Sequence, residues 1–409
     1  MASLSALSGV LRENNARIFY SGSIVCWTGS WVQRIATDWL AWELTHSAFW
    51  VGFLAFATLI PSIVVSPIAG AFADRVDRVR LVTVSSLIAS AQAAALVALV
   101  LTHTVRIEYM AVLAFINGAA ETFAQPARQC LLPGLVPRSH LPGAVALNSL
   151  TYNIARFIGP AISGPMILAW GVVPSIAANG IAFLYAALTL TMLRLDPSVR
   201  RGQASSHSVL HDAIEGVRYV VRHPGLGPIL LFAATVGFTL RALPEMLPPY
   251  VAELFGRGAE GLATLASAMG VAAMLGGFWV AIRGRLEGLT QVALIAVGAL
   301  MCGCVLFVST GSFQVGVIAI IVMGASTPTH GISIQTLLQS AASTAMVGRV
   351  LSLWGMITRA APAMGALVYG TAAEFVGLRI PIYVGCAVCF VMWVYTWSRR
   401  KQIAAALES

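Results

Sequence analysis

Two arginine–carboxylate pairs with the same spacing lie inside long apolar stretches of this 409-residue chain. Arg34 precedes Asp38, and Arg241 precedes Glu245 at positions 207 residues later. Side chains four residues apart on a helix share a face and can pair. A charged side chain in the middle of a membrane-length apolar segment is costly unless it is paired or faces a wet cavity. The pairs therefore predict a membrane transporter with its site at the midplane; pairs that only fix helix packing are the alternative.

Four further polar residues are predicted to line the pathway of substrate or protons. Glu121 has no cation within one helical turn. Because burial without a local cation favours the protonated carboxyl, Glu121 is predicted to load and release a proton, unless it is a neutral acid bonded to another helix. His330 is a further candidate, with a satisfied interior histidine as the alternative. Arg156 and Arg359 could attract an anionic substrate or pair with helix ends.

A charged loop motif follows the second apolar stretch, at residues 70–80. A glycine there permits close helix contact, and an aspartate at the end of the stretch can accept hydrogen bonds from arginine or from a helix N-terminus. The order of residues predicts a cytoplasmic gate formed by Gly70, Asp74, Arg75, Asp77 and Arg78. The alternative is that the arginines only enforce membrane topology.

The composition excludes an ordinary soluble domain. Charged residues make up 10% of the chain and hydrophobic residues 58%, whereas typical soluble chains are about 25% charged. The net charge of +9 comes from basic residues spread over short loops, which argues against a nucleic-acid surface. The sequence holds no catalytic constellation and no glycine-rich phosphate loop with lysine, since the single lysine is Lys401. Neither an enzyme nor a bound cofactor is predicted.

The six cysteines do not predict a metal site. Cys386 and Cys389 have the spacing of a soft-metal pair, but the sequence offers them no second cysteine pair and no nearby histidine. Buried structural thiols are the favoured interpretation.

Twelve apolar stretches reach the length of a membrane-spanning helix, which is about 20 residues. They are residues 18–44, 49–73, 81–101, 109–132, 144–170 and 174–193, then 226–251, 262–282, 290–309, 313–338, 350–373 and 380–397. The pattern predicts an all-α polytopic membrane protein with twelve transmembrane helices in two pseudo-symmetric six-helix halves. The predicted parts are residues 1–193, a cytoplasmic linker at 194–224, and residues 225–409. Within the linker, residues 208–222 predict an amphipathic helix on the membrane surface.

Repeated positions support the two halves. Gly118-Ala119 returns as Gly324-Ala325 at an offset of 206, and Arg156 returns as Arg359 at an offset of 203. Duplicated transporters place their site at the interface of the repeats. The solute is therefore predicted to contact both arginine–carboxylate pairs.

The basic residues predict the orientation. With the N-terminus inside, 18 of the 25 Lys and Arg residues fall on the cytoplasmic side, counting Arg128 near the inner end of its stretch, three on the opposite side and four deeper within the stretches. This bias predicts a multi-pass protein of the plasma membrane, in a bacterium the inner membrane, with both termini in the cytoplasm.

The loop at residues 70–80 is similar to the signature loop of the major facilitator superfamily, and the twelve stretches cover the chain in the same way. The resemblance implies the major facilitator fold. It also implies that Asp74 helps to hold the outward-facing state closed on the cytoplasmic side, with Arg128 and Arg349 as its partners. Asp77 stands where the family pattern often has glycine.

Three shorter segments narrow the resemblance. Residues 41–47 (AWELTHS), 125–128 (QPAR) and 348–352 (GRVLS) are similar to the enterobactin-exporter and macrolide-efflux branch, largely proton-linked exporters of drugs and siderophores. Residues 156–165 resemble the Gly-Pro motif of superfamily antiporters; a structural kink is the alternative.

The predicted function is secondary active transport: export of a small organic solute, such as a drug or a siderophore, in exchange for protons. A lipid or lysolipid flippase or an importer of the same fold is an alternative, and a membrane receptor or assembly scaffold is the alternative from another class. The proton gradient is the expected energy source. The expected partners are the solute and membrane lipids, and a monomer is expected.

Overall fold

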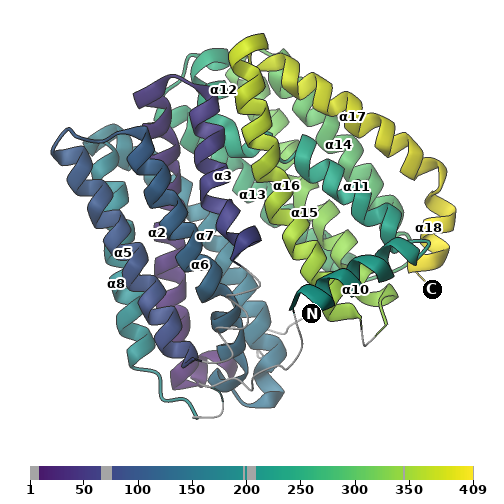
Figure 1. The fold of residues 1–409 in the computed structure, drawn as a ribbon, viewed down its shortest axis with the longest axis horizontal. Helices are drawn as coiled ribbons and strands as arrows, with labels where there is room; N and C mark the ends of the chain where they lie inside the picture. The colour runs from purple at the N-terminus through teal and green to yellow at the C-terminus, as the bar shows by residue number, and fades with distance from the viewer. Residues whose placement is uncertain (1–8, 66–75, 197–198, 200–208, 344–345, 409) are drawn as a thin grey trace. The chain divides into compact units, whose positions relative to one another are not determined.

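The computed structural model describes residues 9–65, 76–196, 199, 209–343 and 346–408. Every regular element in these ranges is helical. The chain divides into two compact units, described separately below (Figure 1). Unit 1 holds residues 1–44, 60–206 and 259–267, and unit 2 holds residues 45–59, 207–258 and 268–409.

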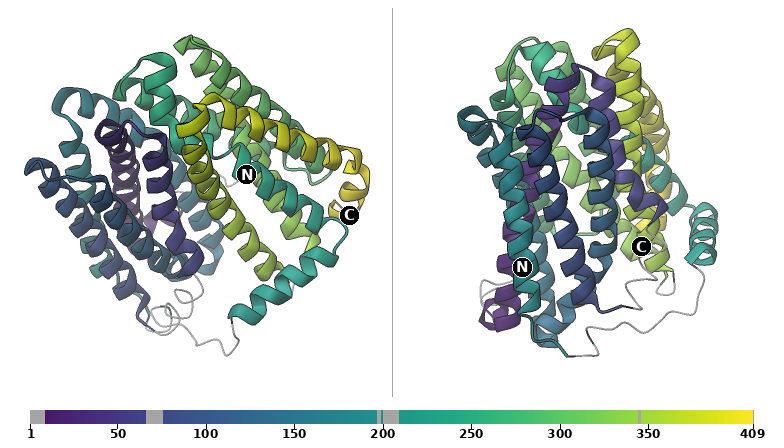
Figure 2. Two further views of the ribbon diagram at one scale, coloured as in Figure 1. Left: turned by 45° about the horizontal axis from the view of Figure 1, so that its top comes forward. Right: turned by 60° about the vertical axis from the view of Figure 1, so that its left-hand side comes forward.

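Unit 1 is built mainly from five long helices. They are α2 (Asn14–Thr45), α5 (Arg78–Leu101), α6 (Ile107–Leu135), α7 (Leu141–Trp170) and α8 (Val172–Thr191). α5 and α8 lie side by side (Figure 1 and Figure 2). Their close approach occurs at Gly180, whose carbonyl oxygen accepts a hydrogen bond of 2.9 Å from Ser90 Oγ.

Unit 2 contains most of the remaining helices. They are α3 (Ala48–Val64), α10 (Val209–Arg222), α11 (Leu226–Thr239), α12 (Leu247–Phe255), α13 (Ala259–Arg283), α14 (Leu289–Ser309), α15 (Phe313–Ala341), α16 (Val347–Val376), α17 (Arg379–Ser398) and α18 (Arg400–Leu407). Two helices are shared: α3 begins in unit 2, and the first nine residues of α13 belong to unit 1.

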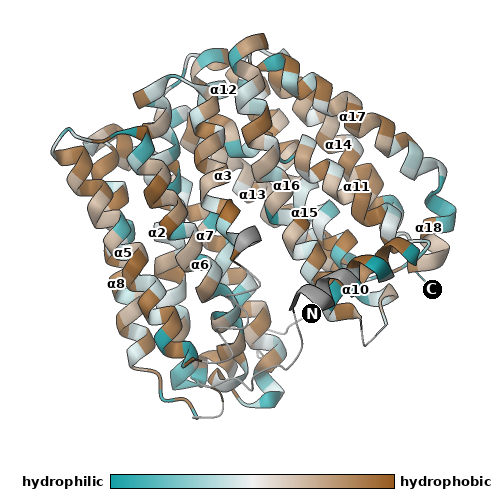
Figure 3. Ribbon diagram, in the orientation of Figure 1, coloured by the Kyte–Doolittle hydropathy of each residue, from teal (hydrophilic) through white to brown (hydrophobic). Residues whose placement is uncertain are grey.

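Eight helices in the described part of the chain are long and apolar enough to cross a membrane. They are α5, α8, α13, α14, α15, α16, α17 and the α11–α12 segment (Leu226–Phe255). Their outer surfaces expose large apolar side chains such as Ile181, Phe278 and Val391, and hydrophobic residues dominate along the helices (Figure 3). A soluble protein rarely exposes contiguous apolar surface of this kind, so these helices are suited to a lipid environment.

A buried cluster of amide side chains joins three helices of unit 1. Gln33 of α2 donates a hydrogen bond of 3.1 Å to Gln92 of α5, and Asn179 of α8 donates one of 2.6 Å to Gln33. All three side chains are buried. Buried amides are stabilising only when they are hydrogen-bonded, so the cluster fixes the register of the three helices.

The linker helix forms where the sequence predicts it, since α10 covers Val209–Arg222. Val217 and Val221 are exposed, whereas Gly216 and Val220 are buried on the opposite side of the helix. The exposed apolar side is what a helix lying on a membrane surface presents to lipid.

Close packing of α7 on α2 depends on a glycine. A Cβ atom at Gly159 would overlap the side chain of Trp31. One turn further along α7, Ser163 Oγ donates a hydrogen bond of 3.0 Å to the carbonyl oxygen of Val32. The glycine of the antiporter-like motif therefore sets the distance between two helices.

His223 connects α10 to α11. Its Nδ1 accepts hydrogen bonds of 3.2 Å from the backbone N–H groups of Gly225 and Leu226, at the start of α11. Burial lowers the pKa of His223 below its ordinary value of 6.5. The neutral imidazole is thus the form that caps the helix, because a protonated Nδ1 cannot accept.

Gly159→Ala is expected to destabilise unit 1 by about 1–3 kcal/mol, because the added methyl group overpacks the contact with Trp31. Thermal unfolding of the purified protein in detergent measures the change. The matched control is Gly355→Ala in α16, where an added Cβ meets no atom within 4 Å. Equal unfolding temperatures for the two variants would contradict the packing role.

The stability of the wild-type chain is expected to fall as the pH drops below 6.5. A folded-state pKa below the unfolded value means that the His223 contribution is complete above pH 6.5 and is lost as pH falls through the folded pKa. His223→Asn keeps an acceptor that cannot titrate, so this part of the pH dependence should disappear from unfolding curves. His103→Asn, at an exposed loop position, should leave it unchanged.

Candidate functional site

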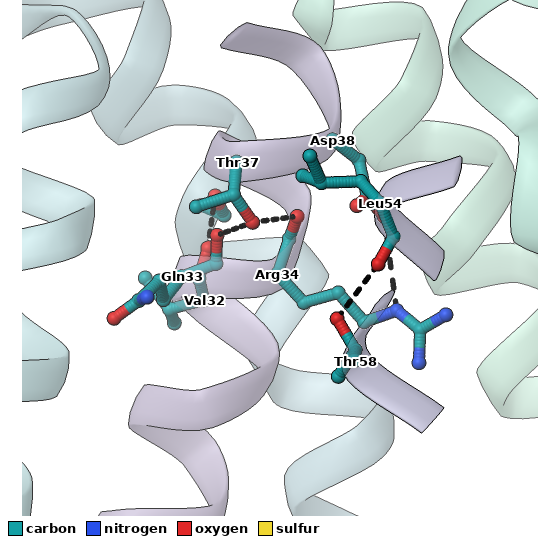
Figure 4. Close-up of polar contacts among 8 residues, drawn as sticks. Val32, Gln33, Arg34, Thr37, Asp38, Leu54 and Thr58 are labelled. Atoms are coloured by element: carbon teal, nitrogen blue, oxygen red, sulfur yellow. Dashed lines mark hydrogen bonds and ion pairs between the residues drawn. The ribbon is translucent and has the colours of Figure 1, made fainter. Parts of the chain in front are cut away.

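The predicted pair on α2 is present. Arg34 Nε lies 3.7 Å from Asp38 Oδ2, and the two side chains are 38% and 23% exposed. Figure 4 shows the pair beside Thr37, whose hydroxyl donates to the carbonyl oxygens of Gln33 and Arg34. The i, i+4 spacing and the exposure leave the pair available to a solute on unit 1.

Trp31 holds a guanidinium from each of two helices against its ring. The Cζ atom of Arg34 lies 5.3 Å from the ring centroid, and that of Arg156, on α7, lies 5.5 Å from it. Tyr152, one turn before Arg156, makes edge contacts with Trp31 at 6.4 Å and with Trp27 at 5.5 Å. Cation–π contacts of this length are attractive and align the guanidinium groups with the rings.

Glu121 departs from its prediction in two ways. Arg128 Nη1 lies 3.9 Å from Glu121 Oε1, so the predicted absence of a local cation is wrong. The two residues are seven apart, which is nearly two helical turns, and therefore share a face of α6. The Glu121 side chain is also 46% exposed rather than buried, whereas that of Arg128 is 7% exposed.

Arg128 continues the row of arginines beside aromatic rings. Its Cζ atom lies 5.7 Å from the ring centroid of Trp27. We refer to the whole set as the basic–aromatic wall of unit 1. The wall consists of Trp27, Trp31, Arg34, Asp38, Glu121, Arg128, Tyr152 and Arg156.

The second predicted pair does not repeat the geometry of the first. α11 ends at Thr239, Arg241 lies in the following turn, and Glu245 lies in the short 3-10 helix Leu243–Met246. The regular helical spacing of the first pair is therefore interrupted at the second. Pro244 removes a backbone donor inside this segment, which interrupts the helix between the two residues.

The other two predicted pathway residues of unit 2 differ in their exposure to solvent. His330 of α15 is buried, with its ring in edge contact with Phe232 of α11 at 5.8 Å. The side chain is thus interior, as the alternative has it, but it is not fully satisfied, because Nδ1 has no hydrogen-bond partner among the described residues. Arg359 of α16 is exposed. In the part of the chain that the structure describes, no group of three or more His, Cys, Asp or Glu residues could hold a metal ion.

The predicted cytoplasmic gate is described only in part. Gly70, Asp74 and Arg75 lie outside the described residues. Asp77 caps α5 by accepting a hydrogen bond of 3.0 Å from the N–H of Arg80. Arg78 Nη1 donates to the carbonyl oxygen of Val199 at 3.0 Å, which connects this one residue to the start of α5.

Arg349 has a partner that the sequence did not suggest. Its Nη1 lies 2.9 Å from Glu215 Oε2 on the linker helix α10. Gly216 allows α10 to approach α16 at the same point, since its Cβ would lie 3.1 Å from that of Arg349. Tyr219 adds a contact by accepting a hydrogen bond of 3.3 Å from the N–H of Ser343. The pair therefore anchors the linker helix to unit 2.

Sequence reasoning also missed the aromatic members of the wall. Trp27 and Trp31 are four residues apart and continue, at helical spacing, toward Arg34 and Asp38. This spacing was a usable signal, because residues at i, i+4 and i+7 lie on one helical face.

Comparisons with known proteins agree with the resemblance found in the sequence. The family described as Transmembrane secretion effector (MFS_3) matches residues 5–407. The chain is 27% identical to the staphyloferrin A transporter of Staphylococcus aureus over 247 residues, which cover 59% of this chain and 62% of that protein. It is 22% identical to macrolide efflux protein A of Streptococcus pyogenes over 365 residues, 88% and 89% of the two chains. The match to the staphyloferrin A transporter thus spans less than two thirds of that relative.

The fold is shared with solved transporters. The crystal structure of the nucleoside transporter NupG has a TM-score of 0.75 to this chain, at 13% identity, and the match covers 94% of this chain and 98% of that one. At this identity the likeness shows the fold alone. The family and the relatives are transporters rather than enzymes, and the predicted resemblance to the macrolide-efflux branch is confirmed.

Removing the charge of Glu215 is expected to loosen α10. Glu215→Gln should increase backbone hydrogen exchange over residues 216–222, by about 0.5 kcal/mol in opening free energy, since a partly exposed ion pair contributes little. Exchanging the charges, with Glu215→Arg and Arg349→Glu together, should restore protection. Arg218→Gln, at an exposed position of the same helix, is the control. Unchanged exchange in Glu215→Gln would contradict the anchoring role.

Proposed function

We propose that this chain is a secondary active transporter that exports a small organic solute in exchange for protons. The chain belongs to the Transmembrane secretion effector family. Twelve spans in two six-helix halves would work by alternating access in the plasma membrane, with both termini in the cytoplasm. The proton gradient would supply the energy without a bound cofactor. The relatives named for macrolide efflux and staphyloferrin A transport support export of an organic solute.

The single observation that carries the proton-coupled part is the contact between Glu121 and Arg128. At 3.9 Å the two side chains attract each other, but the distance is too long for a hydrogen bond. Arg128 Nη1 is buried and has no hydrogen-bond partner within the described ranges. The carboxylate is therefore the nearby negative charge for a buried guanidinium.

This arrangement links proton binding to the position of Arg128. Protonation of Glu121 removes the attraction and leaves the buried guanidinium with the ring of Trp27 but no nearby carboxylate among the described residues, which is costly at low dielectric. Arg128 then gains free energy by moving toward water or toward an anion. Because Glu121 is half-exposed, a proton can reach it without unfolding the helix. A proton taken up at one atom is thus converted into a shift of a charged side chain of the wall.

Glu121→Gln is expected to abolish accumulation driven by a pH gradient while downhill exchange survives, because the amide mimics the protonated acid and cannot release a proton. The measurement uses proteoliposomes with an imposed pH gradient and three probes: a macrolide, ethidium and a citrate-based siderophore. Transport by the wild type is followed under the same gradient.

The matched control is Glu108→Gln, which removes an exposed carboxylate from the first turn of the same helix. This control should behave as the wild type does. Full gradient-driven accumulation in Glu121→Gln would show that another group carries the proton. A wild-type protein that moves none of the probes under any gradient would favour a receptor or scaffold instead.

A further inference from the structure

The basic–aromatic wall carries more positive than negative charge. It has three arginines and two carboxylates, and each carboxylate lies within 4.0 Å of one arginine: Asp38 by Arg34, and Glu121 by Arg128. Arg156 makes no ion pair with any residue that the structure describes, and its observed contact is with the ring of Trp31. One guanidinium of the wall is therefore without a compensating acid.

The position of Arg156 in its helix makes an unpaired charge there costly. α7 runs from Leu141 to Trp170, and in the proposed twelve-span arrangement Arg156 lies near the middle of the fifth span. From there its side chain cannot reach either membrane surface easily, and an uncompensated arginine at this depth is costly unless it faces water or an anion.

The position of the guanidinium is also fixed by packing. Gly159 brings α7 against Trp31, and Ser163 bonds to the backbone of α2 at Val32. These contacts lie one and two turns beyond Arg156 on the same helix. Arg34 shares the Trp31 ring, so the two Cζ atoms are at most about 11 Å apart, the sum of their distances to the centroid. Both guanidinium groups are positively charged, so an anion near both would be attracted by each.

From this geometry we propose that the transported solute is an organic anion: a carboxylate-bearing molecule whose charge pairs with Arg156 and Arg34. A flat or aromatic part of it would lie against Trp31 and Tyr152, of which Tyr152 is 43% exposed. Guanidinium groups bind carboxylates through parallel N–H···O bonds and also stack on flat surfaces, so the wall offers both contacts. A cationic solute would need a carboxylate to itself, and both carboxylates of the wall have an arginine beside them.

The inference rests on the proposed transport function and names its substrate class, so it is tested by binding in the absence of any gradient. The full chain in detergent is titrated with citrate and with benzene-1,3,5-tricarboxylate as anions, and with tetraphenylphosphonium and ethidium as cations. Equilibrium dialysis and tryptophan fluorescence report binding. We expect saturable binding of both anions, tighter for the aromatic one, and weaker binding of the cations.

Substitutions locate the binding. Arg156→Gln should weaken anion binding about tenfold or more, and Arg156→Lys should retain part of it because the charge remains. Trp31→Phe should reduce the advantage of the aromatic anion over citrate. Arg106→Gln, at the exposed N-cap residue that precedes α6 in the same unit, is the control. Unfolding temperatures show that each variant is folded, and Arg156→Lys serves if Arg156→Gln is not.

Three results would overturn the proposal: binding of the cations but not the anions, no anion binding at millimolar concentration, or equal anion affinity in the wild type and in folded Arg156→Gln and Arg156→Lys. The proposed export function fails in a different way. Anion binding that depends on Arg156, without gradient-driven transport, would refute export and support the anion site. Gradient-driven transport of ethidium without anion binding would support export and refute the anion site.

Discussion

The cost of charge at membrane depth is the constraint on which the rest of this structure depends. Five charged side chains lie on the wall of unit 1, each away from the ends of α2, α6 or α7. The exposed fraction of the ion-paired side chains runs from 7% for Arg128 to 46% for Glu121, and the more deeply a charge is buried, the more it needs a partner. Two of the three arginines have a carboxylate as partner, and all three lie beside an aromatic ring. A wall that retains an excess guanidinium under this constraint is organised around something that it binds.

Small residues make these partnerships possible. α7 carries Arg156 to the ring of Trp31 only because Gly159 has no side chain to hold the helices apart. Gly216 plays the same part where α10 meets α16 beside the ion pair of Arg349. In both places a backbone approach sets the distance at which a charged side chain finds its partner. Close helix packing at these glycines is therefore a condition for the electrostatic contacts beside them.

The sequence predicted features set by local spacing and missed those set by packing between distant segments. The Arg34–Asp38 pair and the linker helix follow from helical periodicity, so both could be predicted. The contact of Glu121 with Arg128 lies beyond the spacing of three or four residues at which helical side chains usually pair, although two full turns also return to the same face. Arg349 meets Glu215 across 134 positions of sequence, and the amide cluster joins three helices. Periodicity within one helix carries no information about such contacts.

The repeat in the sequence preserves the helices but not the chemistry. Arg156 rests on an aromatic ring in the middle of α7, whereas its counterpart Arg359 is exposed on α16. Glu121 faces a buried arginine, whereas its counterpart Thr327 donates its hydroxyl hydrogen to the carbonyl oxygen of Met323 within α15. Two halves of a duplicated fold would both have to be helical and closely packed, which agrees with the repeated Gly118-Ala119 and Gly324-Ala325. In the proposed transporter, binding a charged solute and moving a proton need only one set of charges, so one of the two proposed halves can carry that set alone.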